Sequence, residues 1–134
     1  MEQRKNLWLA KAILSISLLS FCSIGLAKTE KHGHIQTRSA GVASFYSDKY
    51  HGLATTSGIP YDKNGLTAAH NSLPMGTQLR VTNLKNNRSV IVKVNDRMSK
   101  SNKHVVDLSK RAAKELGFVQ AGLTKVKIEI LSIA

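Results

Sequence analysis

The chain has 134 residues, a net charge of +12 at pH 7 and one cysteine. This length accommodates a single globular domain. One cysteine excludes a fold held together by internal disulfides, so stability must come from a hydrophobic core. A charge this positive indicates an anionic partner, such as a cell-wall polymer, lipid headgroups or nucleic acid.

Residues 1–27 have the pattern of a secretory signal peptide. Basic residues flank the apolar run ILSISLLSFCSIGLA, which ends in small residues, and Gly25 and Ala27 fit a signal-peptidase site. We therefore expect cleavage after Ala27 and export to the periplasm or cell envelope. The run is short for a bilayer span, which takes about 20 apolar residues, so a retained membrane anchor is the alternative interpretation.

Cys22 lies inside this apolar run, where a cysteine can carry a lipid. The bulky Phe21 directly before it fits a lipoprotein signal poorly. A lipid anchor at Cys22 is thus the alternative to free export, and it would keep the protein close to a membrane.

Residues 28–134 carry 17 Lys and Arg against 7 Asp and Glu, a net charge of +10. The lysines are scattered, and the three Phe and three Tyr of the whole chain form no stacking platform. We therefore do not expect nucleic acid as the partner. Residues 28–40 have almost no apolar content and are expected to form a flexible leader. Its His32 and His34 lack further ligands nearby, so we expect no metal site there.

From residue 41 the sequence predicts a folded domain that extends to residue 134. GVASFYS alternates and predicts a strand over 41–47, and the residues up to 65 are rich in Gly, Thr and Ser, which is typical of a long ordered loop. LTAAHNSLP, residues 66–74, is interpreted as one or two helical turns that Thr67 caps and Pro74 ends.

The second half of the domain alternates more regularly. Residues 78–84 and 89–95 form two alternating runs joined by an Asn-Asn turn, which predicts a β-hairpin. Residues 105–109 suggest a short strand or turn, and 126–131 a last strand. SKRAAKELG predicts a helix with Ser109 or Asp107 as its cap and Gly117 as its end. About six short strands with one good helix favour a small closed barrel, because closure removes exposed strand edges.

Asp96 is the acid that stands out. Val90, Val92 and Val94 share one face of a strand, and the same alternation would place Asp96 on that core face. Burial would raise the pKa of this carboxyl, while the nearby Arg97 would lower it, and the sequence does not decide which effect wins. The alternative is an Asp that accepts hydrogen bonds from backbone amides in a turn.

His70, at the end of the AAH segment, is the second candidate, although a lone histidine is more often a surface or packing residue. No Ser-His-Asp nucleophile motif, phosphate loop or HExxH zinc motif occurs in the chain.

Five segments in this order and spacing resemble the rare lipoprotein A family: GVASFYS, HGLATTSGIPYD, LTAAHNSLPMGTQLRVTNL, SVIVKVNDR and VVDLSKRAAKELG. The match covers residues 41–131. The resemblance implies an all-β fold, a six-stranded double-psi β-barrel with one or two short helices. It also implies a peptidoglycan lytic transglycosylase that prefers glycan strands stripped of stem peptides and leaves 1,6-anhydromuramic acid ends.

Carried over by position, the resemblance assigns Asp96 as the catalytic acid/base and His70 as its partner. The family's third catalytic position is a Glu in TASGE, and the matching segment here is TTSGI, so that position is Ile59. After Arg97 the residues MSK stand where the family has GPF. Since the 6-hydroxyl of the sugar is itself the nucleophile in lytic transglycosylation, one carboxyl group can in principle suffice.

Two hypotheses follow. The first is an exported transglycosylase, a monomer without cofactor or metal, whose partner is the stripped glycan strand. Its candidate sugar-binding residues are Thr56, Ser57, Asn95 and Arg97. The second is a non-catalytic glycan binder that resembles expansins, and Ile59 favours it. A weaker third reading is a basic protein that binds any polyanion, which would make its binding steeply salt-dependent.

Overall fold

The computed structural model describes residues 38–134, and the expected signal peptide, Cys22, His32 and His34 lie outside this range. Among the described residues, no helix has the length and apolar character needed to cross a membrane. The elements in chain order are the strands and helices β1 Arg38–Phe45, the 3-10 helix η2 Asp48–Tyr50, β2 Thr67–His70, β3 Gln78–Asn83, β4 Ser89–Arg97, β5 Val106–Leu108, α1 Lys110–Leu116 and β6 Thr124–Ser132.

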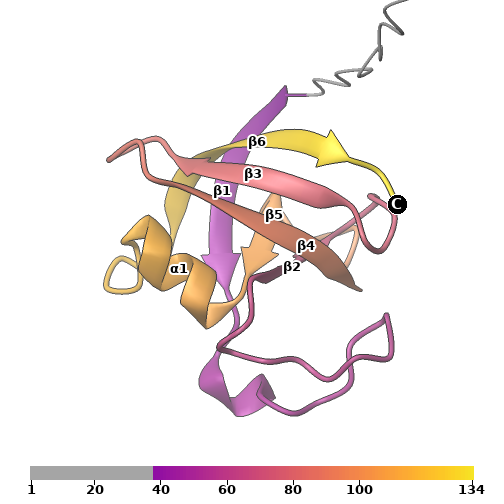
Figure 1. Cartoon of the computed structure of the whole chain (residues 1–134). Coiled ribbons are helices and arrows are strands. Elements are labelled where there is room, and N and C mark those ends of the chain that lie inside the picture. The colour runs from indigo at the N-terminus through magenta and orange to yellow at the C-terminus, as the bar shows by residue number, and fades with distance from the viewer. Residues whose placement is uncertain (1–37) are drawn as a thin grey trace, which may run out of the picture. The chain divides into compact units, whose positions relative to one another are not determined.

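The six strands close into a barrel in the order β1-β5-β2-β4-β3-β6 (Figure 1). Two pairs, β1–β5 and β2–β4, are parallel, and the other four pairs are antiparallel. Every strand therefore has a partner on both sides, which leaves no open edge in the barrel. The predicted closed barrel of six strands is confirmed, and its mixed strand order is consistent with a double-psi β-barrel.

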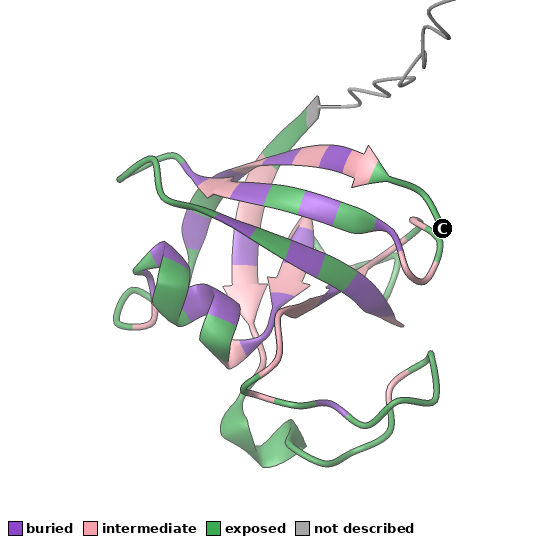
Figure 2. Cartoon of the chain, in the orientation of Figure 1, coloured by how far each residue is buried: buried purple, intermediate pink, exposed green. Residues whose placement is uncertain are grey.

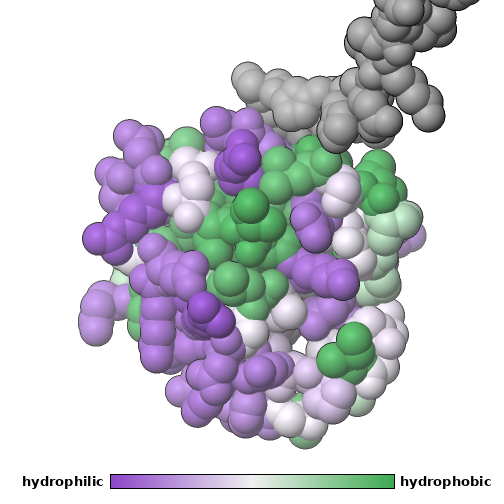
Figure 3. Space-filling model, in the orientation of Figure 1, coloured by the Kyte–Doolittle hydropathy of each residue, from purple (hydrophilic) through white to green (hydrophobic). Residues whose placement is uncertain are grey.

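Alternation along β3 and β4 fills the inside of this barrel, as the colour bands along the two strands show (Figure 2). Leu79, Val81, Val92 and Val94 are almost completely buried. Each such side chain stabilises the fold by roughly 1.5–3 kcal/mol relative to an exposed position. On the side seen in Figure 3, apolar side chains gather over the middle of the barrel and hydrophilic ones surround them.

The segment predicted as helical turns at residues 66–74 is instead the strand β2, which is a correction. It pairs in parallel with β4 and antiparallel with β5, so both of its sides are hydrogen-bonded. Ala68 and Ala69 are at most 1% exposed. Their helix propensity is outweighed because β4 and β5 hydrogen-bond both edges of this segment.

Helix α1 forms where the sequence predicts it, and Ser109 alone acts as its cap. The Ser109 hydroxyl accepts a hydrogen bond from Ala112 N at 3.3 Å, and Gly117 ends the helix with a left-handed φ of 75°. Asp107 is not a cap, contrary to one of the two options above, because it belongs to β5. β1 begins at Arg38, within the segment expected to be a leader.

Replacing Ser109 by alanine should weaken the junction between α1, β2 and the preceding loop. Beyond its capping bond, the buried Ser109 hydroxyl donates to the Gly65 carbonyl at 2.7 Å. Ser109→Ala should therefore lower the free energy of unfolding by about 1–3 kcal/mol, measured by urea titration. Ser101→Ala, at an exposed position, is the control and should stay within about 0.5 kcal/mol of wild type; equal stability of both variants would contradict this account.

Candidate functional site

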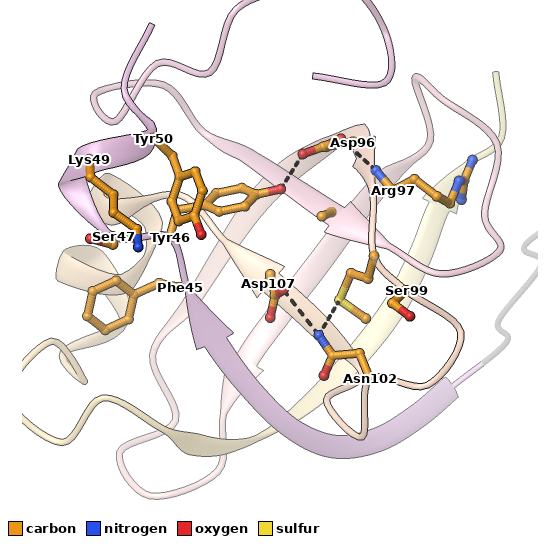
Figure 4. Close-up of a pocket in the computed structure, with 12 residues that line it drawn as sticks. Phe45, Tyr46, Ser47, Lys49, Tyr50, Asp96, Arg97, Ser99, Asn102 and Asp107 are labelled. Atoms are coloured by element: carbon orange, nitrogen blue, oxygen red, sulfur yellow. Dashed lines mark hydrogen bonds between the residues drawn. The ribbon is translucent and has the colours of Figure 1, made fainter. Parts of the chain in front are cut away.

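A pocket of about 510 Å³ opens beside the ends of β1, β4 and β5. Figure 4 shows the carboxylates of Asp96 and Asp107 and the ring of Tyr46 among its lining side chains. Acidic, basic and aromatic groups thus meet in one cavity on a rigid wall of strands. Its lining residues are Phe45, Tyr46, Ser47, Lys49, Tyr50, Ala69, Asp96, Arg97, Met98, Ser99, Asn102 and Asp107.

A β-bulge in β4 brings Asp96 to this pocket. Val94 pairs with Ala68 of β2, but the next β2 residue, Ala69, pairs with Asp96, so Asn95 is an extra residue in β4. Such a bulge shifts the alternation of side chains by one position. The expectation that Asp96 continues the core face of Val94 is therefore wrong: Asp96 is half-buried on the opposite face, and Asn95 is buried beside Val94.

The bulge also places Asp96 in a row of paired residues that crosses four strands. Ser44 of β1 pairs with Asp107 of β5, Asp107 pairs with Ala69 of β2, and Ala69 pairs with Asp96 of β4. Paired residues on neighbouring strands point to the same face of a sheet. Two carboxylates therefore flank a single methyl group, and all three residues line the pocket.

Four donors surround the Asp96 carboxylate. Its Oδ1 accepts from Thr56 N and Thr56 Oγ1, both at 2.9 Å, and from Arg97 N at 2.8 Å. Its Oδ2 accepts from the Tyr46 hydroxyl at 2.5 Å. Hydrogen bonds to a charged acceptor are short and strong, so this arrangement favours the ionised carboxylate.

These bonds decide the question that the sequence left open about the pKa of Asp96. Burial raises the pKa of this carboxyl, but the hydrogen bonds from Tyr46, Thr56 and Arg97 together outweigh it, and the pKa lies below its usual value. Burial and the bond to Asp96 raise the pKa of the Tyr46 phenol far above its usual range. At neutral pH Asp96 is therefore ionised and Tyr46 is a neutral donor.

The long loop before β2 is fastened to the end of β4. It folds back on itself where Tyr61 N donates to Leu53 O at 2.8 Å. Its tip reaches β4 twice, through Ser57 N on the Asn95 carbonyl at 3.2 Å and through Thr56 on Asp96. The carbonyl of the bulge residue Asn95 thus binds the same loop whose Thr56 donates two hydrogen bonds to Asp96.

His70 is tied to Asp96 through Arg97. Arg97 N bonds Asp96, while Arg97 Nη1 donates to the carbonyls of His70 at 3.0 Å and Leu73 at 2.7 Å. The His70 Nδ1 accepts from Ser72 N and Leu73 N, both at 3.1 Å, so the neutral ring carries its proton on Nε2. Burial and the charge of Arg97 lower the pKa of His70, which keeps it neutral at pH 7.

Ile59, at the position where the family has a Glu, is 63% exposed and lies outside the pocket lining. Its carbonyl accepts from Thr55 Oγ1 at 2.5 Å, and its amide donates to Ser57 Oγ at 3.4 Å. The loop therefore keeps an ordered turn at this position with an apolar side chain pointing to solvent.

Of the six predicted site residues, Asp96 and Arg97 line the pocket, and the other four do not: His70, Thr56, Ser57 and Asn95. Among residues 38–134 no group of three or more His, Cys, Asp or Glu could hold a metal ion.

Sequence reasoning missed Tyr46 and Asp107. The centre of the Tyr46 ring lies 4.6 Å from that of Tyr61 and 6.0 Å from that of Tyr50, and both ring pairs are tilted. Tyr46 and Tyr50 line the pocket, and Tyr61 is buried behind them. Both missed residues lie in or directly after segments predicted as strands. Asp107 comes near Asp96 through the pairing of β5 and β4 with β2, and β1, which leads into Tyr46, joins them through its parallel register with β5. A single sequence holds no signal for these registers.

Comparison with known proteins places this geometry in context. A family model described as lytic transglycolase matches residues 38–128. The endolytic peptidoglycan transglycosylase RlpA of Pseudomonas aeruginosa is 51% identical over 92 residues, 69% of this chain and 27% of the relative. The protein of the same name from Neisseria meningitidis is 44% identical over 110 residues, 82% of this chain and 46% of the relative. The chain spans less than half the length of either.

Two solved structures share the fold. The expansin of Clavibacter michiganensis matches with a TM-score of 0.57 and 25% identity, over 71% of this chain and 50% of that one. A Streptomyces papain inhibitor matches with a TM-score of 0.58 and 20% identity, over 71% of this chain and 94% of that one. At this lower identity the inhibitor supports the barrel fold alone.

Tyr46→Phe should raise the pKa of Asp96, because it removes the donor on Oδ2. It should also lower the free energy of unfolding by about 1 kcal/mol. This is less than a buried hydrogen bond to a charged group usually contributes, because water in the open pocket screens the charge. A carboxyl whose pKa is lower in the folded protein than in the unfolded chain, where it is about 3.9, stabilises the fold at a pH above that value. The difference in unfolding free energy between wild type and Tyr46→Phe should therefore be complete at pH 7. It should shrink as the pH falls through the pKa that Asp96 has in the folded protein.

Carboxyl NMR titration and urea unfolding at several pH values measure both effects. Tyr50→Phe, on the pocket rim and outside the hydrogen bonds around Asp96, is the matched control. An unchanged Asp96 titration in Tyr46→Phe would show that the bond to Oδ2 does not hold the charged form.

Proposed function

Because the chain belongs to the rare lipoprotein A-like family of lytic transglycosylases, we propose that it is an exported enzyme that cleaves peptidoglycan glycan strands. The proposed substrate is the strand without stem peptides, and the proposed products end in 1,6-anhydromuramic acid. The observation that carries this proposal is the Asp96 carboxylate, which accepts four hydrogen bonds in an open pocket that Tyr46 and Tyr50 also line.

Lytic transglycosylation needs a base and a negative charge at the same place. The 6-hydroxyl of the muramic acid attacks its own C1, so the base must take a proton from that hydroxyl. Positive charge develops on the sugar ring as the glycosidic bond breaks, and a fixed carboxylate stabilises it. An anionic Asp96 meets both demands, and its four donors need no rearrangement during the reaction.

In this proposal His70 and Arg97 orient Asp96 and the substrate and do not exchange protons. Arg97 connects the main chain of His70 to the carboxylate of Asp96. A neutral His70 with its proton on Nε2 offers a hydrogen-bond donor and no charge. We assign it to orienting the substrate or the segment around Asp96, with Asp96 as the base that takes the proton of the 6-hydroxyl.

The pocket and its surroundings suit a sugar polymer with carboxylates. Tyr50, 43% exposed, presents its ring at the pocket rim, and Lys49 Nζ lies 5.2 Å from the centre of that ring. Muramic acid without its peptide exposes a lactyl carboxylate, which the basic surface would attract. Thr56, Ser57 and Asn95 contribute to sugar binding in this proposal by fixing the loop and the bulge that hold Asp96.

A non-catalytic glycan-binding module is the second candidate function. The exposed Ile59 in place of a carboxylate favours it, and so does the 25% identity to an expansin. In this case the same pocket would hold the strand without cutting it. The proposed cellular setting is the same for both functions: a monomeric exported protein in the cell envelope.

Asp96→Asn should reduce the formation of anhydromuramic ends by about 10²–10⁴-fold, the usual contribution of a positioned acid or base. The amide keeps the size of the side chain, so binding of strands should persist. Mass spectrometry of stripped glycan strands after incubation with the purified protein measures the products, and co-sedimentation measures the binding. Turnover at the wild-type rate would refute the assignment of Asp96.

Ile59→Glu separates the enzyme from the binder. We expect the wild-type protein to cut strands already, and Ile59→Glu to change the rate by no more than about tenfold, because this side chain lies outside the pocket. Ile59→Gln is the uncharged control, and the same product analysis applies. If the wild-type protein co-sediments with strands and only Ile59→Glu cuts them, the glycan-binding alternative holds for the wild-type chain.

A further inference from the structure

The leaving oxygen of the glycosidic bond needs a proton, and Asp96 is poorly placed to give one. Each of its four hydrogen bonds comes from a donor group, and two of the four are main-chain amides that can only donate. An ionised carboxylate that keeps these bonds serves as a base. Ile59, where the family has a Glu, offers no proton. A second acidic group in the pocket would be better placed to give this proton.

Asp107 is the second carboxylate of this pocket. It pairs with Ala69 from the side of β5, as Asp96 does from the side of β4. Neighbouring strands lie about 4.8 Å apart, so two such steps separate the main chains of the two acids by roughly 10 Å. Figure 4 shows both side chains at the same cavity.

The side chain between them leaves room for the reacting bond. Ala69 contributes only a methyl group, and it lines the pocket floor between the two carboxylates. In lytic transglycosylation the 6-hydroxyl reaches C1 from the same face of the sugar ring that O4 leaves. The acid and the base must therefore act on neighbouring oxygens, and two carboxylates that flank one small side chain suit that arrangement.

The hydrogen bonds of Asp107 differ from those of Asp96. Its Oδ1 accepts from the Ser44 hydroxyl, with His104 Nδ1 3.6 Å away, and its Oδ2 has only the Asn102 amide at 3.4 Å. A distance of 3.4 Å lies at the outer limit of a hydrogen bond. The hydrogen bond on Asp107 Oδ2 is therefore much weaker than the bond of 2.5 Å on Asp96 Oδ2, so Asp107 Oδ2 is the carboxylate oxygen available to a bound substrate.

We propose that Asp107 is the proton donor to the leaving oxygen, so that this chain divides acid and base between Asp107 and Asp96; this inference rests on the proposed function. The C1–O4 bond breaks as Asp107 gives its proton to O4. The C1–O6 bond forms as Asp96 takes the proton of the 6-hydroxyl. The proton then returns from Asp96 to Asp107 through water in the open pocket, and no water is consumed.

A substrate that needs no proton tests this division. The probe is a stripped glycan oligosaccharide whose terminal N-acetylmuramic acid carries 2,4-dinitrophenolate at C1, a group that leaves without protonation. On natural strands Asp107→Asn should lower the rate by about 10²–10⁴-fold, and on the activated probe by less than about tenfold. Asp96→Asn should lose activity on both, because the base is needed in each case.

Asp62→Asn makes the same chemical change at an exposed carboxylate outside the pocket and is the matched control. Equal losses on both substrates for Asp107→Asn, or no loss on either, would overturn the proton-donor role while leaving the proposed function intact. If the wild-type protein cuts neither substrate, the proposed function fails and this inference with it. Circular dichroism verifies that each variant folds. If Asp107→Asn does not fold, Asp107→Glu is compared on the same two substrates. A larger loss of rate on natural strands than on the activated probe supports the proton-donor role, and equal losses overturn it.

Discussion

The extra residue in β4 opposite β2 is the constraint on which the candidate site depends. Without it, alternation would carry Asp96 into the barrel interior behind Val94, where an ionised carboxylate is costly. With it, Asn95 takes the buried position and Asp96 turns toward solvent-accessible partners. The bulge also frees the Asn95 carbonyl to bind the long loop, whose Thr56 supplies two of the four donors on Asp96. One inserted residue thus places the carboxylate and fastens the loop that completes its surroundings.

Burial and hydrogen bonding oppose each other at Asp96, and hydrogen bonding wins. The reason is the number and nature of the donors: two main-chain amides, a threonine hydroxyl and a phenol converge on one carboxylate that is only half-buried. A site of this kind favours the ionised carboxylate over the protonated carboxylic acid. In the proposed reaction this preference makes Asp96 the base, and the second carboxylate of the pocket, Asp107, is the residue proposed as the acid.

Most of the fold was predictable because its strands and helix depend on local patterns. The hairpin of β3 and β4 follows from alternating valines around an Asn-Asn turn, and α1 from a serine cap and the terminal Gly117. Strand β2 was not predictable in this way. Ala68 and Ala69 favour a helix in isolation, and they are extended here because β4 and β5 hydrogen-bond both of their edges.

The sequence by itself determined the type of barrel and singled out Asp96 and His70, since residue order and spacing carry that information. The tertiary structure alone decided which face Asp96 occupies, that its pKa is lowered, and that Tyr46 and Asp107 share its pocket. These features arise from a bulge and from the register of parallel strands. Both bring together residues that are far apart in the chain. They are fixed by main-chain hydrogen bonds between strands, which every residue type except proline can both donate and accept, so they leave no local signature in the sequence.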